Sequence, residues 1–217
     1  MTLYQPSHTN LSSKSHTGLE RPSSRFIKRT FDLVGACFGL LLLWWVIALA
    51  WVAASMEFRR NGFFIQKRVG MNGRLFSLVK IRTMREIGGV STTVTCANDP
   101  RITRLGRILR RTKIDELPQL CNVLIGDMSI VGPRPDIKGF ADLLQGEQRL
   151  LLSVRPGITG PATLKYRREE EILNNLTDPE TYNRTVIWPD KVRINVNYVK
   201  NWSFRQDLKY IWRTLVK

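Results

Sequence analysis

The sequence predicts an α+β protein dominated by helices, with a small β-hairpin in its main domain and one N-terminal helix embedded in a membrane. Three observations support this fold class. An uncharged apolar run extends from Leu33 to Met56, Asn72-Gly73 separates two β-favouring runs, and several later segments carry apolar side chains at helical spacing. Because the chain has 217 residues, we expect one compact domain with short appendages.

The chain divides into three predicted parts. Residues 1–24 are rich in Ser, Thr, Asn and Pro and are expected to form a disordered tail, whose polar start is unlike a cleavable secretory signal. Residues 25–60 are expected to form a membrane-embedded helix with basic flanks. Residues 61–217 are expected to form a cytoplasmic domain that ends in an amphipathic helix.

The apolar run is long enough to cross a bilayer core of about 30 Å, and it contains Trp44, Trp45 and Trp51. A buried core helix is the alternative, but an uncharged run of this length favours membrane insertion. Basic residues both precede and follow the run, and such residues favour the cytoplasmic side. A re-entrant helix that enters, bends and returns keeps both flanks on that side, so we expect re-entry, although no proline marks the bend.

The segment after the membrane helix predicts a hairpin, because Asn72-Gly73 is a strong two-residue turn signal. Period-two alternation on the second strand places Lys80 and Arg82 on one face. These two cations are either a solvated surface or part of a phosphate site, and the strand pattern does not decide between them. Residues 86–98 are expected to form a mobile loop.

Helices are predicted for most of the remaining chain. Asp99-Pro100 has the pattern of an N-cap followed by proline at the first helical position, and Asp115 is expected near the start of a second helix. Residues 137–153 are expected to form an amphipathic helix, whereas 161–200 has no assignable pattern. Residues 204–215 carry an apolar face that either packs on the domain or lies in the membrane interface, which we favour.

The charge balance indicates an anionic partner, because 34 Lys and Arg face 18 Asp and Glu, a formal net charge of +16. That partner is either a nucleic acid or an anionic membrane leaflet. The only histidines, His8 and His16, lie in the tail, so catalysis in the main domain would depend on carboxylates, cations and a hard metal ion. Three widely separated cysteines suggest neither a disulfide framework nor a zinc site.

Two adjacent carboxylates, Asp115 and Glu116, stand at the centre of a strongly basic stretch. Six cations occupy the fifteen preceding positions, and a rigid Gly-Pro-Arg-Pro turn (residues 132–135) carrying Arg134 follows. One or two cations would satisfy an acid pair, so this excess predicts a bound polyanion on which the acids act. A helix-terminal aspartate with a purely structural role is the alternative for Asp115. The six cations are Arg101, Arg104, Arg107, Arg110, Arg111 and Lys113.

Eight segments in order resemble the bacterial sugar transferase family, the small monotopic polyprenyl-phosphate phosphoglycosyl transferases. The resemblance implies transfer of a sugar-1-phosphate from a UDP-sugar to undecaprenyl phosphate, with release of UMP, through a covalent aspartyl-phosphosugar intermediate. It also implies a role in starting exopolysaccharide, O-antigen or other glycoconjugate synthesis at the cytoplasmic face of the bacterial inner membrane. The segments begin at Lys28, Phe64, Lys80, Asp99, Asp115, Asn122, Val131 and Arg155.

Carried over by position, Asp115 resembles the nucleophile and Glu116 the ligand of an essential Mg²⁺. The family's membrane helix usually has a Ser-Pro pair at its bend, where this sequence has Trp44-Trp45. That departure affects the expected re-entrant shape but not the cytoplasmic motifs. The residues expected to bind the substrate phosphates or the nucleotide are Lys80, Arg82, Arg110, Arg134, Pro133 and Pro135.

The expected partners are therefore a UDP-sugar, undecaprenyl phosphate and anionic lipids of the inner leaflet, with a homo-oligomer as a further possibility. A non-catalytic, membrane-tethered basic module is the alternative function. Nucleic acid is not expected, because its recognition motifs are missing and the aromatic residues concentrate in apolar stretches rather than alternating with cations. The sequence does not identify the sugar.

Overall fold

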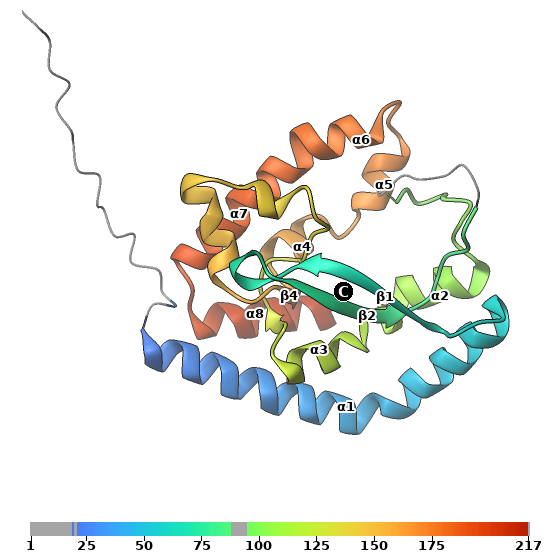
Figure 1. Cartoon of the computed structure of the whole chain (residues 1–217), viewed down its shortest axis with the longest axis horizontal. Helices are drawn as coiled ribbons and strands as arrows, with labels where there is room; N and C mark the ends of the chain where they lie inside the picture. The colour runs from blue at the N-terminus through green and yellow to red at the C-terminus, as the bar shows by residue number, and fades with distance from the viewer. Residues whose placement is uncertain (1–18, 20, 88–94, 217) are drawn as a thin grey trace, which may run out of the picture.

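The computed structural model describes residues 19, 21–87 and 95–216, and it places a long helix, α1 (Pro22–Phe58), along the base of the domain (Figure 1). The predicted tail, 1–24, falls mostly outside the described residues, as does the centre of the predicted loop at 86–98. Helices predominate, as the predicted fold class requires, and the strands form two small sheets, the predicted hairpin and one further pair.

Helix α1 is 37 residues long and spans about 55 Å at 1.5 Å per residue. It continues through Trp44-Trp45 without interruption and follows an arc that is convex on the side facing away from the domain (Figure 1). Its buried apolar positions are small, at Ala36, Ala50 and Ala54, whereas its large apolar side chains are mostly exposed. Just 11% of its most apolar window is buried, unlike a core helix, and its length and composition suit a membrane.

The predicted hairpin is confirmed. Strand β1 (Phe63–Val69) pairs antiparallel with β2 (Leu75–Ile81), and a short 3₁₀ turn, η1 (Met71–Gly73), joins them. Asn72 and Gly73 both have positive φ, at 58° and 78°, which are values that these two residue types tolerate best. The turn therefore fixes the register, in which Lys80 lies opposite Phe64.

The next helices carry the acidic pair. Helix α2 (Arg104–Thr112), the 3₁₀ turn η2 (Ile114–Glu116) and α3 (Gln119–Ile125) follow one another, and β3 (Ser129–Val131) then pairs in parallel with β4 (Gly157–Thr159). The predicted cap at Asp99 is wrong, because Thr103 caps α2 by accepting a 2.9 Å hydrogen bond from the Gly106 amide. Asp99 instead binds Arg101, with 2.6 Å between Oδ2 and Nη2.

The predicted α-helix at 137–153 is also wrong in type. The segment forms two 3₁₀ helices, η3 (Ala141–Leu143) and η4 (Gly146–Ser153), and Gly146 at the start of η4 has a φ of 54° that an α-helix does not allow. The unassigned region at 161–200 is mainly helical. It contains α4 (Pro161–Lys165), α5 (Glu169–Asn174), α6 (Pro179–Tyr182), the π-helical turn η5 (Asn183–Ile187) and α7 (Trp188–Lys200).

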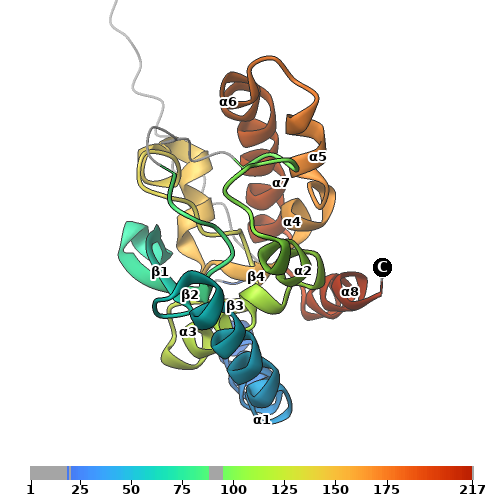
Figure 2. The same ribbon diagram turned by 90° about the vertical axis from the view of Figure 1, so that its right-hand side faces the viewer.

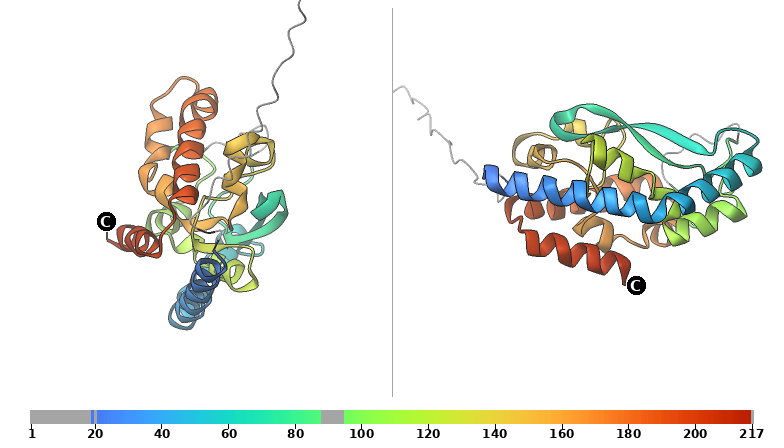
Figure 3. Two further views of the ribbon diagram at one scale, coloured as in Figure 1. Left: turned by 90° about the vertical axis from the view of Figure 1, so that its left-hand side faces the viewer. Right: turned by 90° about the horizontal axis from the view of Figure 1, so that it is seen from below.

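The last helix, α8 (Phe204–Leu215), lies alongside the N-terminal half of α1 (Figure 3). Its apolar face is divided between the two predicted environments. The Phe204 ring packs edge-on against Phe31 of α1, with 5.1 Å between ring centroids, and Ile211 packs against a buried cluster. Trp212 and Leu215 are exposed.

Two apolar clusters hold α1 against the rest of the domain. Ala36 packs with Phe76 of β2 and Val123 of α3, while Ala50 and Ala54 pack with Ile81 and Leu109 further along the helix. The small alanine side chains allow close approach of the backbones, so the domain contacts α1 near its middle and towards its C-terminal end. Figure 2 shows α2, α3 and α8 above α1, on the side where the domain lies.

Candidate active site

The two acids lie in η2, directly after α2. Lys113 ends α2 in the left-handed conformation, with a φ of 61°, and this reversal turns the following residues back towards the domain. Both carboxylates are consequently buried, with Asp115 5% exposed and Glu116 9% exposed. Buried acids of this kind require compensating cations or a ligand.

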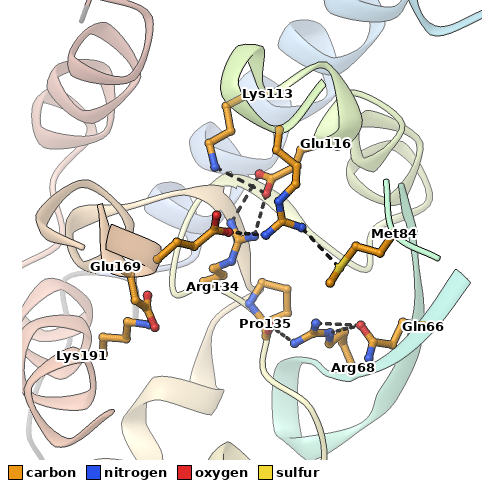
Figure 4. A network of polar contacts seen from close by, with 11 residues as sticks. Gln66, Arg68, Met84, Lys113, Glu116, Arg134, Pro135, Glu169 and Lys191 are labelled. Atoms are coloured by element: carbon orange, nitrogen blue, oxygen red, sulfur yellow. Dashed lines mark hydrogen bonds and ion pairs between the residues drawn. The ribbon is translucent and has the colours of Figure 1, made fainter. Parts of the chain in front are cut away.

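Glu116 is held by the arginine of the Gly-Pro-Arg-Pro turn (Figure 4). Arg134 Nη2 donates to Glu116 Oε1 at 2.7 Å and Nη1 donates to Oε2 at 3.4 Å, while Lys113 Nζ lies 4.0 Å from Oε1. Burial alone would raise the pKa of Glu116, but the charges of Arg134 and Lys113 outweigh it and hold the pKa well below its usual value. Glu116 is therefore ionised at neutral pH.

Asp115 has a different environment from its neighbour. Within the part of the chain that the structure describes, its buried Oδ1 has no hydrogen-bond partner. Burial, and then the charge of Glu116, raise the pKa of Asp115 to about 6, although Lys80, Arg110 and Lys113 act in the opposite direction. A buried carboxylate oxygen without a donor costs free energy, so it indicates a group that acts on a ligand rather than one that stabilises the fold.

Lys80 approaches the acids from β2. Burial, and then the charges of Arg68 and Arg134, lower the pKa of Lys80 to about 8. Arg68 of β1 is a site cation that the sequence analysis missed. It donates to the Pro135 carbonyl at 3.3 Å and to Gln66 Oε1 at 2.7 Å, and Figure 4 shows it beside the turn. The hairpin register contained the signal, because it places Arg68 and Lys80 on the same face.

Arg110 of α2 is paired with Glu170 of α5, and its Nη1 also lies 3.8 Å from the sulfur of Met84. The neighbouring Glu169 accepts from Lys191 Nζ at 2.5 Å. Figure 4 shows this pair on the side of Arg134 away from Met84. These acidic residues and Lys191 were also missed, since the region had no assignable pattern. Glu169 and Glu170 of α5 thus lie beside the cations near the acidic pair.

The structure brings together five of the predicted site residues, Lys80, Arg110, Asp115, Glu116 and Arg134. Arg82 is not among the main charges that act on the acids, although it and Lys80 both lie against the Phe64 ring. Its Nη2 donates to the Phe63 carbonyl at 3.3 Å, its guanidinium lies 5.5 Å from the Phe64 ring centroid, and its charged neighbours are Arg60 and Glu86.

The two predicted prolines flank Arg134 and contact other segments through their backbone carbonyls. The Pro133 carbonyl accepts from the Gly157 amide at 2.8 Å, and the Pro135 carbonyl accepts from Arg68. Proline also fixes φ, so the turn presents Arg134 in a restricted orientation. The contacts of Pro133 and Pro135 in this structure are therefore structural supports for Arg134.

The model of the family described as bacterial sugar transferase matches residues 23–217. The chain belongs to the bacterial sugar transferase family. It is 36% identical over 191 residues to the uncharacterized sugar transferase EpsL of Bacillus subtilis, which covers 88% of this chain and 86% of that protein. It is 35% identical over 215 residues to the UDP-glucose:undecaprenyl-phosphate glucose-1-phosphate transferase of Caulobacter vibrioides, which covers 97% of this chain and 76% of the relative.

A further relative is the Escherichia coli (strain K12) protein named UDP-glucose:undecaprenyl-phosphate glucose-1-phosphate transferase. It is 36% identical over 201 residues, which make up 89% of this chain and 40% of that protein. The match includes the acidic pair and the Gly-Pro-Arg-Pro turn in this chain's numbering, since the family model extends from residue 23 to residue 217. The cationic cluster is thus part of the matched sugar transferase domain.

The carboxylates of this sugar transferase fit a magnesium ion whose remaining ligands would be phosphate oxygens of the substrate. Among the described residues there is no group of three or more Asp, Glu, His or Cys side chains of the kind that forms an all-protein metal cage. Mg²⁺ commonly binds one or two carboxylates together with phosphate oxygens. Glu116, which is ionised, supplies oxygen donors of that type.

Proposed function

We propose that this sugar transferase moves a sugar-1-phosphate from a UDP-sugar to undecaprenyl phosphate and releases UMP, and that Asp115 carries the phosphosugar between the two substrates. The names of the Caulobacter and Escherichia coli relatives support this donor and acceptor class. The observation that carries the mechanism is the buried Oδ1 of Asp115, which has no hydrogen-bond partner among the described residues and lies beside Glu116 and several cations. On this proposal the reaction starts exopolysaccharide synthesis or that of a related glycoconjugate.

The cations allow a carboxylate to attack an anionic substrate. A diphosphate would repel Asp115, so its charge must be reduced before the reacting atoms can meet. Arg134, Arg68 and Lys80 lie around the acids on the side of the hairpin and the turn. Arg110 joins them when the donor's phosphate replaces Glu170 as its partner.

The proposed reaction has two displacements at one phosphorus atom. Asp115 Oδ1 attacks the phosphorus that bears the sugar, and the bond from that phosphorus to the bridging oxygen breaks, so that UMP leaves with the electron pair. A phosphate oxygen of undecaprenyl phosphate then attacks the same phosphorus, and the bond to Asp115 breaks to restore the carboxylate. The covalent intermediate allows a water-soluble donor and a lipid acceptor to use the same site in turn.

Glu116 is the proposed magnesium ligand. Its depressed pKa keeps it ionised, as a metal ligand must be, and its present partner Arg134 can bind phosphate oxygens instead. When bound, Mg²⁺ would reduce the negative charge of the donor's phosphates. Glu116 thereby has a role distinct from that of Asp115, whose free oxygen performs the attack.

The packing of α1 favours a re-entrant membrane helix. Lys28 and Asp32 near its start, and Ala50 and Ala54 near its end, all pack on the same domain. A straight span would carry one end of the helix to the opposite face of the membrane, away from that domain. We therefore propose that both ends stay on the cytoplasmic side of the bacterial inner membrane, with the apolar outer side of the arc in the lipid.

Other exposed apolar residues support the same orientation. Ile108 of α2, Ile125 of α3, and Trp212 and Leu215 of α8 are all exposed, and these helices lie on the side of α1 that faces the domain (Figure 2). We propose that they lie at the membrane surface, where the net charge of +16 favours anionic lipids. Cysteines introduced at positions 20 and 60 of a cysteine-free variant should then both be inaccessible to an impermeant thiol reagent in intact cells. Labelling of one alone would indicate a full span.

The direct test of the activity is UMP release from a panel of UDP-sugars, with polyprenyl phosphate and Mg²⁺ present and the protein in lipid. We expect release with at least one sugar and its loss in Asp115→Asn. Glu147→Gln, at an exposed ion pair with Lys200, is the matched control and should retain the rate. Absence of release with every sugar, or an equal rate in Asp115→Asn, would contradict the proposal and favour the non-catalytic module.

A further inference from the structure

A second cluster of buried charges joins the start of α1 to β3 and α8. Lys28 Nζ donates to Asp207 Oδ2 at 2.7 Å and to the Val131 carbonyl at 2.9 Å. Lys28 is 8% exposed and Asp207 1% exposed. Asp207 also accepts from Tyr198 Oη at 2.7 Å and from Trp202 Nε1 at 2.9 Å, so both of its oxygens have donors.

Asp32 lies one helical turn after Lys28 and binds the same strand. Its Oδ1 accepts from the Ile130 amide at 2.9 Å and from Ser129 Oγ at 3.0 Å, and the residue is 2% exposed. Helix α1 therefore holds β3 by two charged side chains, one bound to a carbonyl and the other to an amide. The contacts with Val131 and Ile130 specify particular backbone atoms, whereas apolar packing alone would allow the strand to shift.

Strand β3 leads directly into the turn that carries Arg134. Val131 is followed by Gly132, whose amide donates to the Thr159 carbonyl at 2.9 Å, and then by the two prolines around Arg134. A Cβ at Gly132 would lie 2.6 Å from the Arg155 carbonyl oxygen, so the backbone is tightly enclosed there. Because this short connection is stiff, the position of β3 sets the position of the Arg134 guanidinium relative to Glu116.

We infer that Lys28, Asp32 and Asp207 are positioning residues for the transfer reaction, which act by fixing β3 and thereby aiming Arg134 at Glu116 and the substrate phosphates. This inference rests on the proposed function and deepens it, because it couples the membrane helix to the charge-neutralising arginine. It also gives a role to the Lys28–Asp32 segment, which the reaction itself does not use. Hydrophobic residues could hold the helix on the domain, but they would not fix the register of the strand.

The first test follows the backbone directly. In Lys28→Met we expect amide hydrogen exchange to rise within residues 129–135, at the amides of 129–132 and 134, because the two prolines have none. The control, Arg29→Met, removes a neighbouring cation that binds the Val123 and Leu124 carbonyls at 2.7 and 3.0 Å, and it should raise exchange at α3 instead. Unchanged exchange at 129–135 would overturn the inference. This readout does not depend on catalysis, so it separates failure of the inference from failure of the proposed function.

The second test is a double-mutant cycle with Arg134→Lys. We expect Lys28→Met to lower kcat/KM about 10- to 100-fold in the wild-type background, as misplacement of a catalytic group by about 1 Å does. In the Arg134→Lys background the further loss should be less than about threefold, because Lys28 acts on the reaction through the position of Arg134. The effect of Arg29→Met should be the same in both backgrounds. Equal losses for Lys28→Met in both backgrounds would mean a merely structural role.

A paired variant guards against loss of folding. Lys28→Met combined with Asp207→Asn removes both members of the buried ion pair and keeps side-chain atoms near Tyr198 and Trp202. Asp32 keeps its hydrogen bonds from Ile130 and Ser129, so the variant should fold. It still lacks the donor to the Val131 carbonyl. We expect it to show the raised exchange at 129–135 and the reduced kcat/KM. Wild-type exchange and rate in this folded variant would contradict the inference.

Discussion

The domain contains two buried clusters in which acids lie beside cations, one around Asp207 and one around Asp115. The two aspartates differ in hydrogen bonding more than in burial. Asp207 is 1% exposed and accepts from Lys28, Tyr198 and Trp202. Asp115 is 5% exposed, and its Oδ1 has no partner within the described chain. Proximity to a lysine therefore does not distinguish a structural acid from a reactive one, whereas the completeness of its hydrogen bonds does.

The two clusters also differ in the balance of charge. Lys28 and Asp207 form an ion pair whose hydrogen bonds are supplied by the protein itself. Around Asp115 and Glu116 the cations outnumber the acids. One of these cations, Arg110, forms an ion pair with Glu170 of α5. The first cluster has its hydrogen bonds complete. In the second, the pairing of Glu116 with Arg134 favours the folded state, whereas the buried Oδ1 of Asp115 costs stability.

The largest expected effect comes from exchanging one carboxylate for an amide in each cluster. Asp115→Asn should lower UMP release at least about 1,000-fold, as loss of a nucleophile does, yet raise the free energy of unfolding by about 1 kcal/mol at pH 8 because a buried charge is removed. Asp207→Asn should lower the free energy of unfolding by about 3 kcal/mol, because Lys28 is left charged without its counter-ion. Thermal unfolding in detergent, monitored beside UMP release, checks both signs. Destabilisation by Asp115→Asn would remove the contrast between the clusters.

A smaller effect is expected at two neighbouring cations, Lys80 of β2 and Arg82 directly after that strand. Lys80→Met should lower kcat/KM about 100-fold, because Lys80 lies among the acids and the cations that we propose bind phosphate. Arg82→Met should change it less than about threefold, since Arg82 binds backbone carbonyls away from the acids. Steady-state kinetics at several donor concentrations will separate the two. Equal losses would place Arg82 in the substrate site.

The pH dependence should report the same cluster. Attack requires ionised Asp115, with a pKa of about 6, and charged Lys80, with a pKa of about 8, so kcat/KM should be bell-shaped with limbs near these values. Activity at pH 5 should be about tenfold below the maximum. In Lys80→Arg the alkaline limb should move to higher pH while the acid limb stays, and an unmoved alkaline limb would assign it to another group.

Stability should vary with pH in the opposite sense on the acid side. The pKa of Asp115 is raised on folding from 3.8 to about 6, so the folded protein holds an extra proton between these values. The stability contributed by this group is complete below about pH 4 and is lost as the pH rises through 6. Asp115→Asn should remove this component from the unfolding curve, and denaturant unfolding between pH 4 and 8 would detect it. An unchanged slope would mean that Asp115 titrates normally.

The smallest expected effect concerns Glu170 of α5, the ion-pair partner of Arg110. Glu170→Gln should lower KM for the UDP-sugar about two- to fivefold, because the donor's phosphate no longer displaces a carboxylate from Arg110. The matched control is Glu171→Gln, at an exposed contact with Arg168, which should leave KM unchanged. A raised KM in Glu170→Gln would mean that Glu170 helps to bind the donor instead.

Local signals in the sequence predicted the features that depend on neighbouring residues. Asn72-Gly73 predicted the hairpin because these two residues tolerate positive φ. The run from Leu33 to Met56 predicted the long helix because it is uncharged and long enough to cross a bilayer core, and its large side chains are mostly exposed in the structure. The acidic pair and Arg134 were found because they stand in a basic stretch with a rigid turn. At 137–153 the apolar spacing did not separate an α-helix from 3₁₀ helices, since both place residues i and i+3 near each other.

Features that depend on distant contacts could not be predicted in this way. Lys28 and Asp207 are 179 residues apart, and Arg110 and Glu170 are 60 apart, so no local pattern announces either pair. The cap predicted at Asp99 was wrong because an ion pair with Arg101 competed for the same oxygens. The hydrogen bonding that distinguishes Asp115 from Asp207 arises only in the packed domain.

The central claim is that Asp115 has a free oxygen because that oxygen bonds to phosphorus. Incubation of the lipid-embedded protein with a radiolabelled UDP-sugar and Mg²⁺, without lipid acceptor, tests it most directly. The account predicts label bound to the wild-type protein, no label in Asp115→Asn, and release of the label when undecaprenyl phosphate is added. Turnover with acceptor but persistent absence of label, or equal labelling of Asp115→Asn, would contradict it.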